Sequence, residues 1–348
     1  MHTPRASLFH SASPSHLSNL YKIMSKPLVS VISPCYNVAP YIGRFLDSLL
    51  AQTYKKLELI LVNDGSTDNT GNIIEKYIPL LKDQGYKVIY IEQKNGGQSS
   101  AINNALKLVT GKFLTWPDSD DWLTPDSIEK RVIFLQKHPD VGMVRCRVES
   151  IDSETGDSKG ILGREEATAP FLIKGGFEQL VFAHTWFAPV GYMIQTDFFD
   201  KVVKNREIYV TQQGGQNWQM MLPMAHAYPF WQMTDVLGYY CVREDSHSHA
   251  PIDFNSILSY NQVCEDVLKN TLAKISCSES IIKRVQAKYA LQRFILADKH
   301  SKLLSKCRYF YNAIKYEQTK RGKLKLCEIL LFPPCIRRIS RMIFNRFK

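Results

Sequence analysis

The chain has 348 residues, of which 45% are hydrophobic and 22% charged, values typical of a globular protein with a sizeable core. Its net charge is +11, but residues 320–348 hold nine Lys or Arg and one acid, so the rest of the chain is close to neutral. No apolar stretch approaches the ~18 residues that suggest a membrane span. Residues 1–26 are rich in Ser, His and Pro without the apolar run of a secretory signal, and we expect a disordered tail there.

Apolar runs alternate with helical periodicity through the first 150 residues. The runs predict strands at 28–32, 57–62, 87–91, 113–116 and 141–148. The periodic segments predict helices at 41–52, 68–82, 99–109 and from Pro125 to about Lys137. This alternation predicts an α/β fold with a mainly parallel sheet and helices on both faces. In such a sheet, ligands bind beyond the carboxyl ends of the strands.

The second half of the chain is less regular. Residues 150–250 are rich in Gly and aromatic residues, with a strand expected at 238–242. Residues 255–316 show the spacing of two or three amphipathic helices. We therefore predict one α/β domain over residues 27–250 and a helical C-terminal region over residues 251–348.

The loop after the first strand reads Ser33-Pro34-Cys35-Tyr36-Asn37. Tyr36 is suited to stacking on a nucleotide base, and Asn37 to hydrogen bonding with it. When the motif is taken alone, a surface turn is the favoured interpretation.

The loop after the second strand reads Asn63-Asp64-Gly65-Ser66-Thr67-Asp68. Gly65 permits a sharp turn, and Thr67 or Asp68 can cap the helix that follows. Capping accounts for one acid and leaves Asp64, a suitable acceptor for the N3–H of uracil.

The third loop contains three acids in four residues, Asp118-Ser119-Asp120-Asp121. Such a cluster needs a counter-charge, and a hard divalent cation with oxygen ligands supplies one. If the chain is extended here, Asp118 and Asp120 lie on the same side, one for a ribose hydroxyl and the other for a metal on a diphosphate. The alternative is a cluster of helix-capping acids.

Taken together and in this order, the three loops resemble those of family 2 glycosyltransferases with the GT-A fold. The segment Asn95-Gly96-Gly97-Gln98-Ser99-Ser100-Ala101-Ile102-Asn103 resembles the start of a helix in the same family. The resemblance implies inverting transfer of a sugar, commonly from a UDP-sugar, to an acceptor hydroxyl. It also implies base binding by Asp64, a ribose contact from Asp118, and Mn²⁺ or Mg²⁺ held by Asp120 as a Lewis acid. Gly97 and Asn103 are further candidates for nucleotide binding.

The acceptor side departs from the family pattern. The family usually has Gly-Glu-Asp-Trp, whose Asp is the general base, where this chain has Gly215-Gln216-Asn217-Trp218. An amide hydrogen-bonds a sugar but takes no proton at neutral pH. The base is therefore open between Asn217 and the later acid Asp245. A non-catalytic nucleotide-sugar binder of the same fold is the alternative function.

The segment after the predicted strand at 238–242 contains His247, a candidate for completing the metal ligands; a polar surface loop is the alternative. Trp186 and Trp218 are suited to stacking on sugar rings, although a place in the core explains them as well.

The basic segment 320–348 has an amphipathic pattern after Pro333-Pro334. Ile336, Ile339 and Ile343 share one helical face, and Arg337, Arg338 and Arg341 another. This predicts a helix in the plane of an anionic membrane surface, against the alternative of a solvated basic helix packed on the domain. We expect a cytoplasmic, membrane-peripheral enzyme of surface-polysaccharide or glycolipid synthesis. No recognised module accompanies the charge, so nucleic acid is not expected as a partner.

Overall fold

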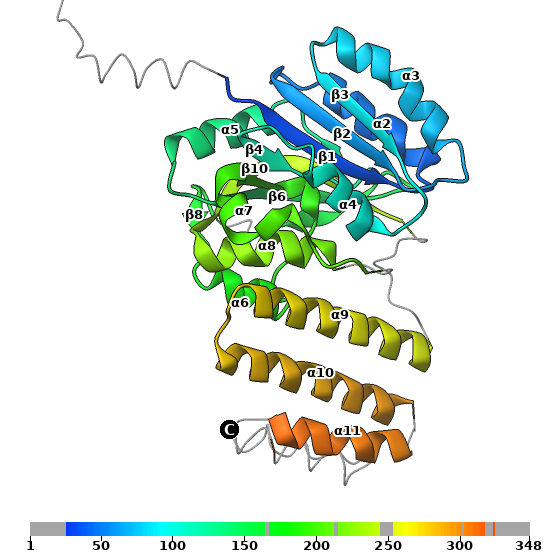
Figure 1. Ribbon diagram of the computed structural model, residues 1–348, viewed down its shortest axis with the longest axis vertical. Helices are drawn as coiled ribbons and strands as arrows, with labels where there is room; N and C mark the ends of the chain where they lie inside the picture. The colour runs from blue at the N-terminus through cyan, green and yellow to red at the C-terminus, as the bar shows by residue number, and fades with distance from the viewer. Residues whose placement is uncertain are drawn as a thin grey trace, which may run out of the picture.

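The structure, a computed structural model, describes residues 26–163, 167–211, 215–243, 253–300, 303–316 and 323. An α/β region occupies one end of the molecule, and the last helices stack in succession against it (Figure 1). The elements of the first half are β1 (Val29–Cys35), α2 (Ala39–Leu50), β2 (Leu57–Asn63), α3 (Thr70–Asp83), β3 (Lys87–Glu92), α4 (Gln98–Leu106), β4 (Phe113–Thr115), β5 (Trp122–Leu123) and α5 (Ser127–Lys137). The predicted helices and strands of this half are present, with ends shifted by a few residues.

The second half of the sheet region is more regular than its sequence indicates. Its elements are β6 (Met143–Asp152), β7 (Ser158–Leu162), β8 (Phe171–Leu172), α6 (Gly176–Val181), the 3₁₀ turn η1 (Pro189–Gly191), β9 (Tyr192–Gln195), α7 (Thr196–Val202), the 3₁₀ turn η2 (Lys204–Arg206), α8 (Gln216–Ala227) and β10 (Phe230–Val242). The strand predicted at 238–242 is the end of the much longer β10.

One mixed sheet joins these strands in the order β3-β2-β1-β4-β9-β6-β10-β5. Strand β1 lies between β2 and β4 and is parallel to both, and β2 is parallel to β3. Strand β9 runs antiparallel to β4 and β6, and β10 runs parallel to β6. The longest pairings are thus parallel, which confirms the predicted α/β class. The carboxyl ends of β1, β2 and β4 meet at one edge.

The central strands are buried on both faces, as expected of a parallel sheet covered by helices. In β2, alternate side chains enter different clusters. Leu59 and Leu61 pack in the cluster that contains residues of α2, α3 and α5. Ile60 and Val62 pack in the cluster that contains residues of α4, α6 and α8. These two apolar layers hold the strand ends in fixed positions.

The C-terminal helices described are α9 (Phe254–Lys274), α10 (Glu279–Lys299) and α11 (Leu303–Tyr316). Asp253 caps α9 by accepting hydrogen bonds from the backbone N–H groups of Asn255 and Ser256. The buried Glu265 of α9 pairs with Arg293 of α10 at 2.5 Å. These contacts agree with the predicted helices, while the domain limits at 250 and 251 stay a prediction. Within the described ranges, no helix is long and apolar enough to cross a membrane.

The prediction that a loop begins at Ser33 is wrong. Residues Ser33, Pro34 and Cys35 continue β1 in parallel register with Leu61, Val62 and Asn63. Pro34 lies beyond the last pair of β1 with β4, Val31 with Thr115, so β1 pairs there with β2 alone, and proline is tolerated at such an edge position. Strand β1 is therefore longer at its carboxyl end than predicted, and the first loop is reduced to Tyr36, Asn37 and Val38.

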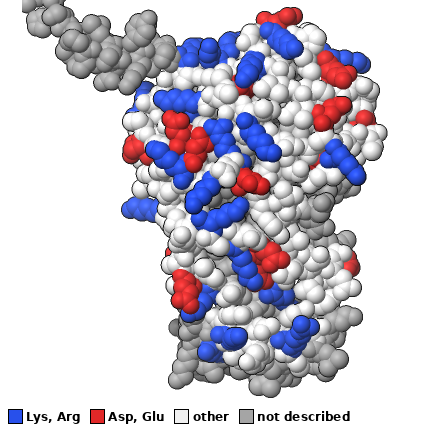
Figure 2. Space-filling model, viewed as in Figure 1, with Lys and Arg blue, Asp and Glu red and all other residues white. Residues whose placement is uncertain are grey.

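The surface view shows Lys and Arg interspersed with Asp and Glu over the face drawn in Figure 2. On this face the described residues form no continuous basic surface of the kind that binds nucleic acid. The predicted membrane segment at 320–348 lies outside the described residues, apart from Lys323.

Candidate functional site

Asp64 lies at the end of β2, where its backbone N–H donates to the carbonyl of Cys35 at the end of β1, 2.8 Å away. Its side chain is 2% exposed. The Oδ1 atom accepts from the backbone N–H of Gly96 at 2.8 Å and from Nε2 of Gln93 at 2.7 Å. Gly65 follows with φ of +70°, and a Cβ there would lie 2.8 Å from the backbone nitrogen of Asn95. The carboxylate is thus fixed by the segment that leads into α4.

The acidic residues 118–121 form a turn instead of an extended segment. The backbone N–H of Asp121 donates to the carbonyl of Asp118 at 3.2 Å. The three carboxylates consequently meet different partners. Asp118 Oδ1 accepts from Gln98 Nε2 at 2.6 Å, and Asp120 Oδ2 lies 3.3 Å from Arg243 Nε. Asp121 is fully buried, and its Oδ1 accepts from the backbone N–H of Cys241 at 2.9 Å.

The electrostatics of this turn favour a positive partner. Burial, and then the charge of Asp120, raise the pKa of Asp118. Burial, followed by the charges of Asp120 and Asp118, raises the pKa of Asp121 well above its usual range. Arg243 opposes both shifts because its charge stabilises the ionised carboxylates. One further oxygen, Oδ2 of Asp121, is buried and has no hydrogen-bond partner among the described residues.

The first loop lies against the second. Asn37 adopts a positive φ of 49°, and its Oδ1 accepts from the backbone N–H of Thr67 at 2.8 Å. The predicted capping residue Asp68 accepts from the backbone N–H of Thr70 in the first turn of α3. Its other oxygen accepts from Ala39 at the start of α2. Tyr36 is 42% exposed, which leaves its ring available for stacking. The structure thus joins Asn37 to the second loop and leaves Tyr36, the preceding residue, exposed beside it in the chain.

Gln216 and Asn217, the amides of the acceptor side, begin α8, and Asn217 contacts Trp116, two residues before the third loop. Asn217 Oδ1 accepts from the indole Nε1 of Trp116 at 3.2 Å, and its Nδ2 donates to the carbonyl of Phe187 at 3.4 Å. Gln216 is buried, with no partner for Oε1 among the described residues. Trp218 packs edge-on against Phe187, as a core residue does.

Two predicted candidates are not described by the structure, and three residues at the site were not predicted. Asp245 and His247 lie outside the described residues. Sequence reasoning missed Arg243, Gln93 and Gln98. The signal for Arg243 was its place directly after a predicted strand, and the signal for Gln98 was its place at a helix start facing the site.

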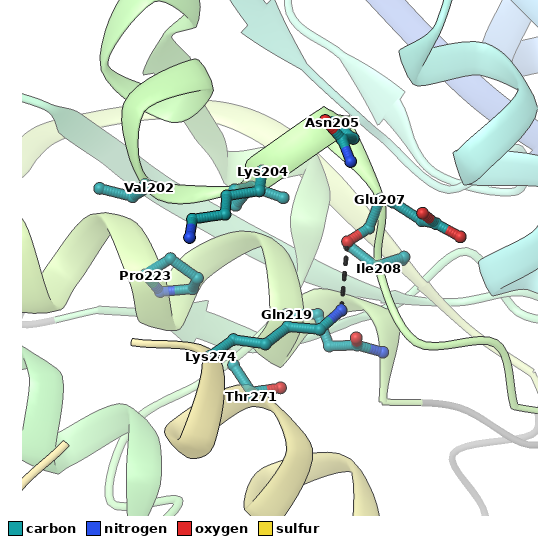
Figure 3. Close-up of a pocket in the computed structure, with 10 residues that line it drawn as sticks. Val202, Lys204, Asn205, Glu207, Ile208, Gln219, Pro223, Thr271 and Lys274 are labelled. Carbon is teal, nitrogen blue, oxygen red and sulfur yellow. Dashed lines mark hydrogen bonds between the residues drawn. The ribbon is translucent and has the colours of Figure 1, made fainter. Parts of the chain in front are cut away.

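A cavity of about 300 Å³ lies outside the three loops, between η2, α8 and α9. Lys204 and Lys274 stand at its edge, and Lys274 Nζ donates to the carbonyl of Glu207 at 3.4 Å (Figure 3). Ile208 links the cavity wall to α4, because its backbone N–H and carbonyl both pair with the Asn103 amide at 2.9 Å. Asn103, predicted to bind nucleotide, uses its side chain in this structural contact.

The profile described as Glycosyl transferase family 2 matches residues 30–193. An uncharacterized glycosyltransferase of *Rickettsia prowazekii*, RP339, is 43% identical over 131 residues, which are 37% of this chain and 39% of that protein. The putative glycosyltransferase EpsH of *Bacillus subtilis* is 33% identical over 164 residues, 47% of this chain and 46% of that protein. The matched regions span less than half the length of these relatives.

Two solved structures share the fold. *S. aureus* TarS 1–349 in complex with UDP-GlcNAc aligns with a TM-score of 0.60 and 20% identity, covering 84% of this chain and 82% of that one. The mannosyltransferase PcManGT from *Pyrobaculum calidifontis*, in complex with GDP-Man and Mn²⁺, aligns with a TM-score of 0.52 and 19% identity, covering 90% of this chain and 83% of that one. At these identities the likeness establishes the GT-A-like fold.

Proposed function

The chain belongs to glycosyl transferase family 2, and we propose that it moves a sugar from a nucleotide-sugar donor to an acceptor hydroxyl. One observation carries the proposal. The start of α4 reaches two acids that follow β2 and β4, the strands on either side of β1, through Gly96 to Asp64 and through Gln98 to Asp118. The start of α4 thereby connects Asp64, proposed to bind the nucleotide base, with Asp118, proposed to bind the ribose.

The sheet topology supports a nucleotide at this point. Strand β1 is flanked by β2 on one side and β4 on the other, so the chain order reverses there, and sheets of this kind bind ligands beyond the carboxyl ends at such a point. Tyr36 and Asn37 stand at the end of β1 and are proposed to contact the base. The start of α4, after Gly97, directs backbone N–H groups and the positive end of the helix dipole towards this edge, a suitable place for phosphate.

The donor is proposed to be a UDP-sugar. This rests on the resemblance and on Asp64, whose carboxylate is an acceptor for the N3–H of uracil. The neighbours TarS and PcManGT were crystallised with UDP-GlcNAc and GDP-Man respectively, so one fold admits both nucleotides. The acceptor is proposed to be a surface-polysaccharide or glycolipid precursor, because the basic segment 320–348 has the pattern of a membrane-surface helix.

The divalent cation that the sequence predicts is not part of this proposal. Asp120, its predicted ligand, lies 3.3 Å from the guanidinium of Arg243, and Oδ1 of Asp118 and Oδ1 of Asp121 accept from other donors, while the remaining oxygen of Asp121, Oδ2, is buried. Among the residues that the structure describes, no group of three or more His, Cys, Asp or Glu is arranged to hold a metal ion. The described donor set does not fit a preformed cation site.

The general base is proposed to be Asp245. Inverting transfer needs a group that removes the acceptor proton, and Asn217 cannot do so because an amide has no basicity at neutral pH. Asp245 is the remaining candidate from the sequence, and it lies outside the described residues. Asp245→Asn is expected to lower kcat by 10²-fold or more while nucleotide binding is retained, which is about the contribution of a general base.

The test is turnover of a panel of UDP-sugars with a panel of saccharide and lipid-linked acceptors. Asp64→Asn is the informative variant, because Oδ1 can still accept from Gly96 while the other oxygen becomes an NH₂ that cannot accept the uracil N3–H. We expect weaker UDP binding in this variant and unchanged binding in the exposed control Asp140→Asn.

A non-catalytic binder is the second candidate, favoured by the amides at Gln216 and Asn217. Its signature is UDP binding without transfer or hydrolysis for any donor and acceptor. If neither UDP nor GDP binds, both candidates fail.

A further inference from the structure

The end of β10 brings an arginine to the acidic turn. Arg243 is the residue directly after β10, and its Nε lies 3.3 Å from Asp120 Oδ2. Only 10% of its side chain is exposed. The guanidinium also stands over the ring of Tyr41 in α2, with 4.8 Å between Cζ and the ring centre. The positive charge of Arg243 is therefore held at the acidic turn by two contacts, one with Asp120 of the turn and one with Tyr41 of α2.

The position of Arg243 is fixed by the backbone as well as by its own side chain. Two residues earlier, the N–H of Cys241 donates to Asp121 Oδ1, so the end of β10 is tied to the acidic turn. Tyr41 lies in the first turn of α2, next to the Tyr36–Val38 loop. A buried guanidinium is costly unless a carboxylate and a π face compensate for its lost hydration, and both are present here. The arrangement holds positive charge where the donor diphosphate is expected.

We propose that Arg243 binds the donor diphosphate and takes the part that the sequence assigned to a divalent cation; this rests on the function proposed above. A guanidinium is planar, remains charged at any physiological pH, and presents a fork of N–H donors that matches two phosphate oxygens. Asp120 and Tyr41 orient this fork. The residue contacts the substrate and is catalytic in that sense.

The chemistry requires a positive charge at this point. The acceptor oxygen forms a bond to the anomeric carbon while the bond from that carbon to the phosphate oxygen breaks. The electron pair leaves with the nucleoside diphosphate, and the acceptor proton passes to a general base. Arg243 stabilises the negative charge that develops on the leaving oxygen.

A guanidinium and a divalent cation compete at this turn. A cation bound to Asp120 would bring two positive charges within a few ångströms of Arg243, which is unfavourable at this low exposure. Either the cation displaces Arg243 from Asp120, or Arg243 serves in its place. The contacts to Tyr41 and the tie through Cys241 favour the second arrangement.

The experiment measures binding of UDP and GDP, and of UMP and GMP, to the full chain in EDTA and in Mn²⁺. The variants are Arg243→Gln and Arg243→Lys. Arg284→Gln is the matched control, because Arg284 also combines an ion pair, to Glu178 at 2.8 Å, with a ring contact, to Phe182 at 4.4 Å, on the remote α10.

The expected result is that the wild type binds the diphosphate equally well in EDTA and in Mn²⁺. Arg243→Gln should weaken diphosphate binding by about 10- to 100-fold, the usual effect of losing a charge-assisted hydrogen bond. Monophosphate binding should change little, which separates a phosphate contact from a general structural loss. Arg243→Lys should keep part of the affinity, and Arg284→Gln all of it.

The inference is overturned if the wild type binds diphosphate only with Mn²⁺, or if Arg243→Gln weakens mono- and diphosphate equally. In both cases nucleotide binding, and with it the proposed function, still stands. If no nucleotide binds to the wild type under either condition, the proposed function itself fails.

Discussion

The amide of Asn217 is predicted to support the site by holding Trp116. Trp116 is fully buried, and its indole N–H donates to Asn217 Oδ1 at 3.2 Å. Pro117 and the acidic turn follow Trp116 directly in the chain. Asn217→Ala would leave the indole N–H without its acceptor in a buried place. Asn217→Asp keeps an acceptor oxygen for the indole N–H and is the conservative comparison for stability alone, because its added negative charge is expected to alter nucleotide binding.

The expected loss for Asn217→Ala is about 1–3 kcal/mol of unfolding free energy, the cost of an unsatisfied buried donor. The second bond, to Phe187, is long at 3.4 Å and adds little. Urea denaturation of the full chain measures the change. Asn270→Ala is the control, because its exposed amide bonds only to a carbonyl of its own helix. It should stay within about 0.5 kcal/mol of the wild type.

Nucleotide binding and turnover of the same variants complete the test. If Asn217 acts through Trp116, the loss of stability and a weaker affinity for UDP should appear together in Asn217→Ala. Unchanged stability combined with abolished turnover would refute this reasoning, because it would mean that the amide acts directly on the acceptor.

Three further outcomes are expected. Glu58 is buried and accepts hydrogen bonds from Ser30, from Lys87, and from the backbone and side chain of Thr110. Burial raises its pKa, but these bonds outweigh burial and hold it below the usual value. The stability that ionised Glu58 contributes is thus complete above the unfolded pKa of about 4.3 and is lost as the pH falls through the folded pKa. Glu58→Gln should therefore lower the free energy of unfolding by about 1.5–3 kcal/mol at pH 7 and by less at pH 3.5, as measured by urea denaturation. Gly65→Ala should weaken UDP binding in calorimetry, because the new Cβ would lie 2.8 Å from the backbone of Asn95. Deleting residues 320–348 should abolish flotation with anionic liposomes and leave UDP binding intact; equal partitioning of both proteins would remove the membrane role.

The first half of the fold was predictable because its elements are locally encoded. Strand β2 is apolar from Leu59 to Val62 and buried on both faces, and α2 repeats apolar residues on one face. The end of β1 was not predictable in the same way. Ser33 and Pro34 have turn-forming side chains, yet the register with Leu61 and Val62 keeps them in the strand. Pairing with a neighbouring strand overrode local preference there.

Strands β9 and β10 show where sequence reasoning ends. Strand β9 is short, and its place between β4 and β6 depends on antiparallel pairing with segments far away in sequence. Strand β10 has register shifts between Gln232 and Gly238, which interrupt the period of two that identifies a strand. The acidic turn raised a similar problem. Adjacent acids in a turn diverge, so spacing alone could not show that Asp121 faces Cys241 while Asp120 faces Arg243.

The proposed role of Arg243 and the amides at Gln216 and Asn217 both depart from the family pattern, and their effects on the charge of the site compensate for one another. A guanidinium in place of a divalent cation supplies one positive charge fewer beside the Asp118–Asp121 turn. Amides in place of the family's Glu and Asp remove two negative charges at Gln216 and Asn217, and Asn217 reaches the residue that leads into that turn. A site with fewer acids needs less positive charge to hold a diphosphate, so each change makes the other tolerable. Restoring one acid, as in Asn217→Asp, should therefore weaken UDP binding in EDTA and make it more dependent on Mn²⁺.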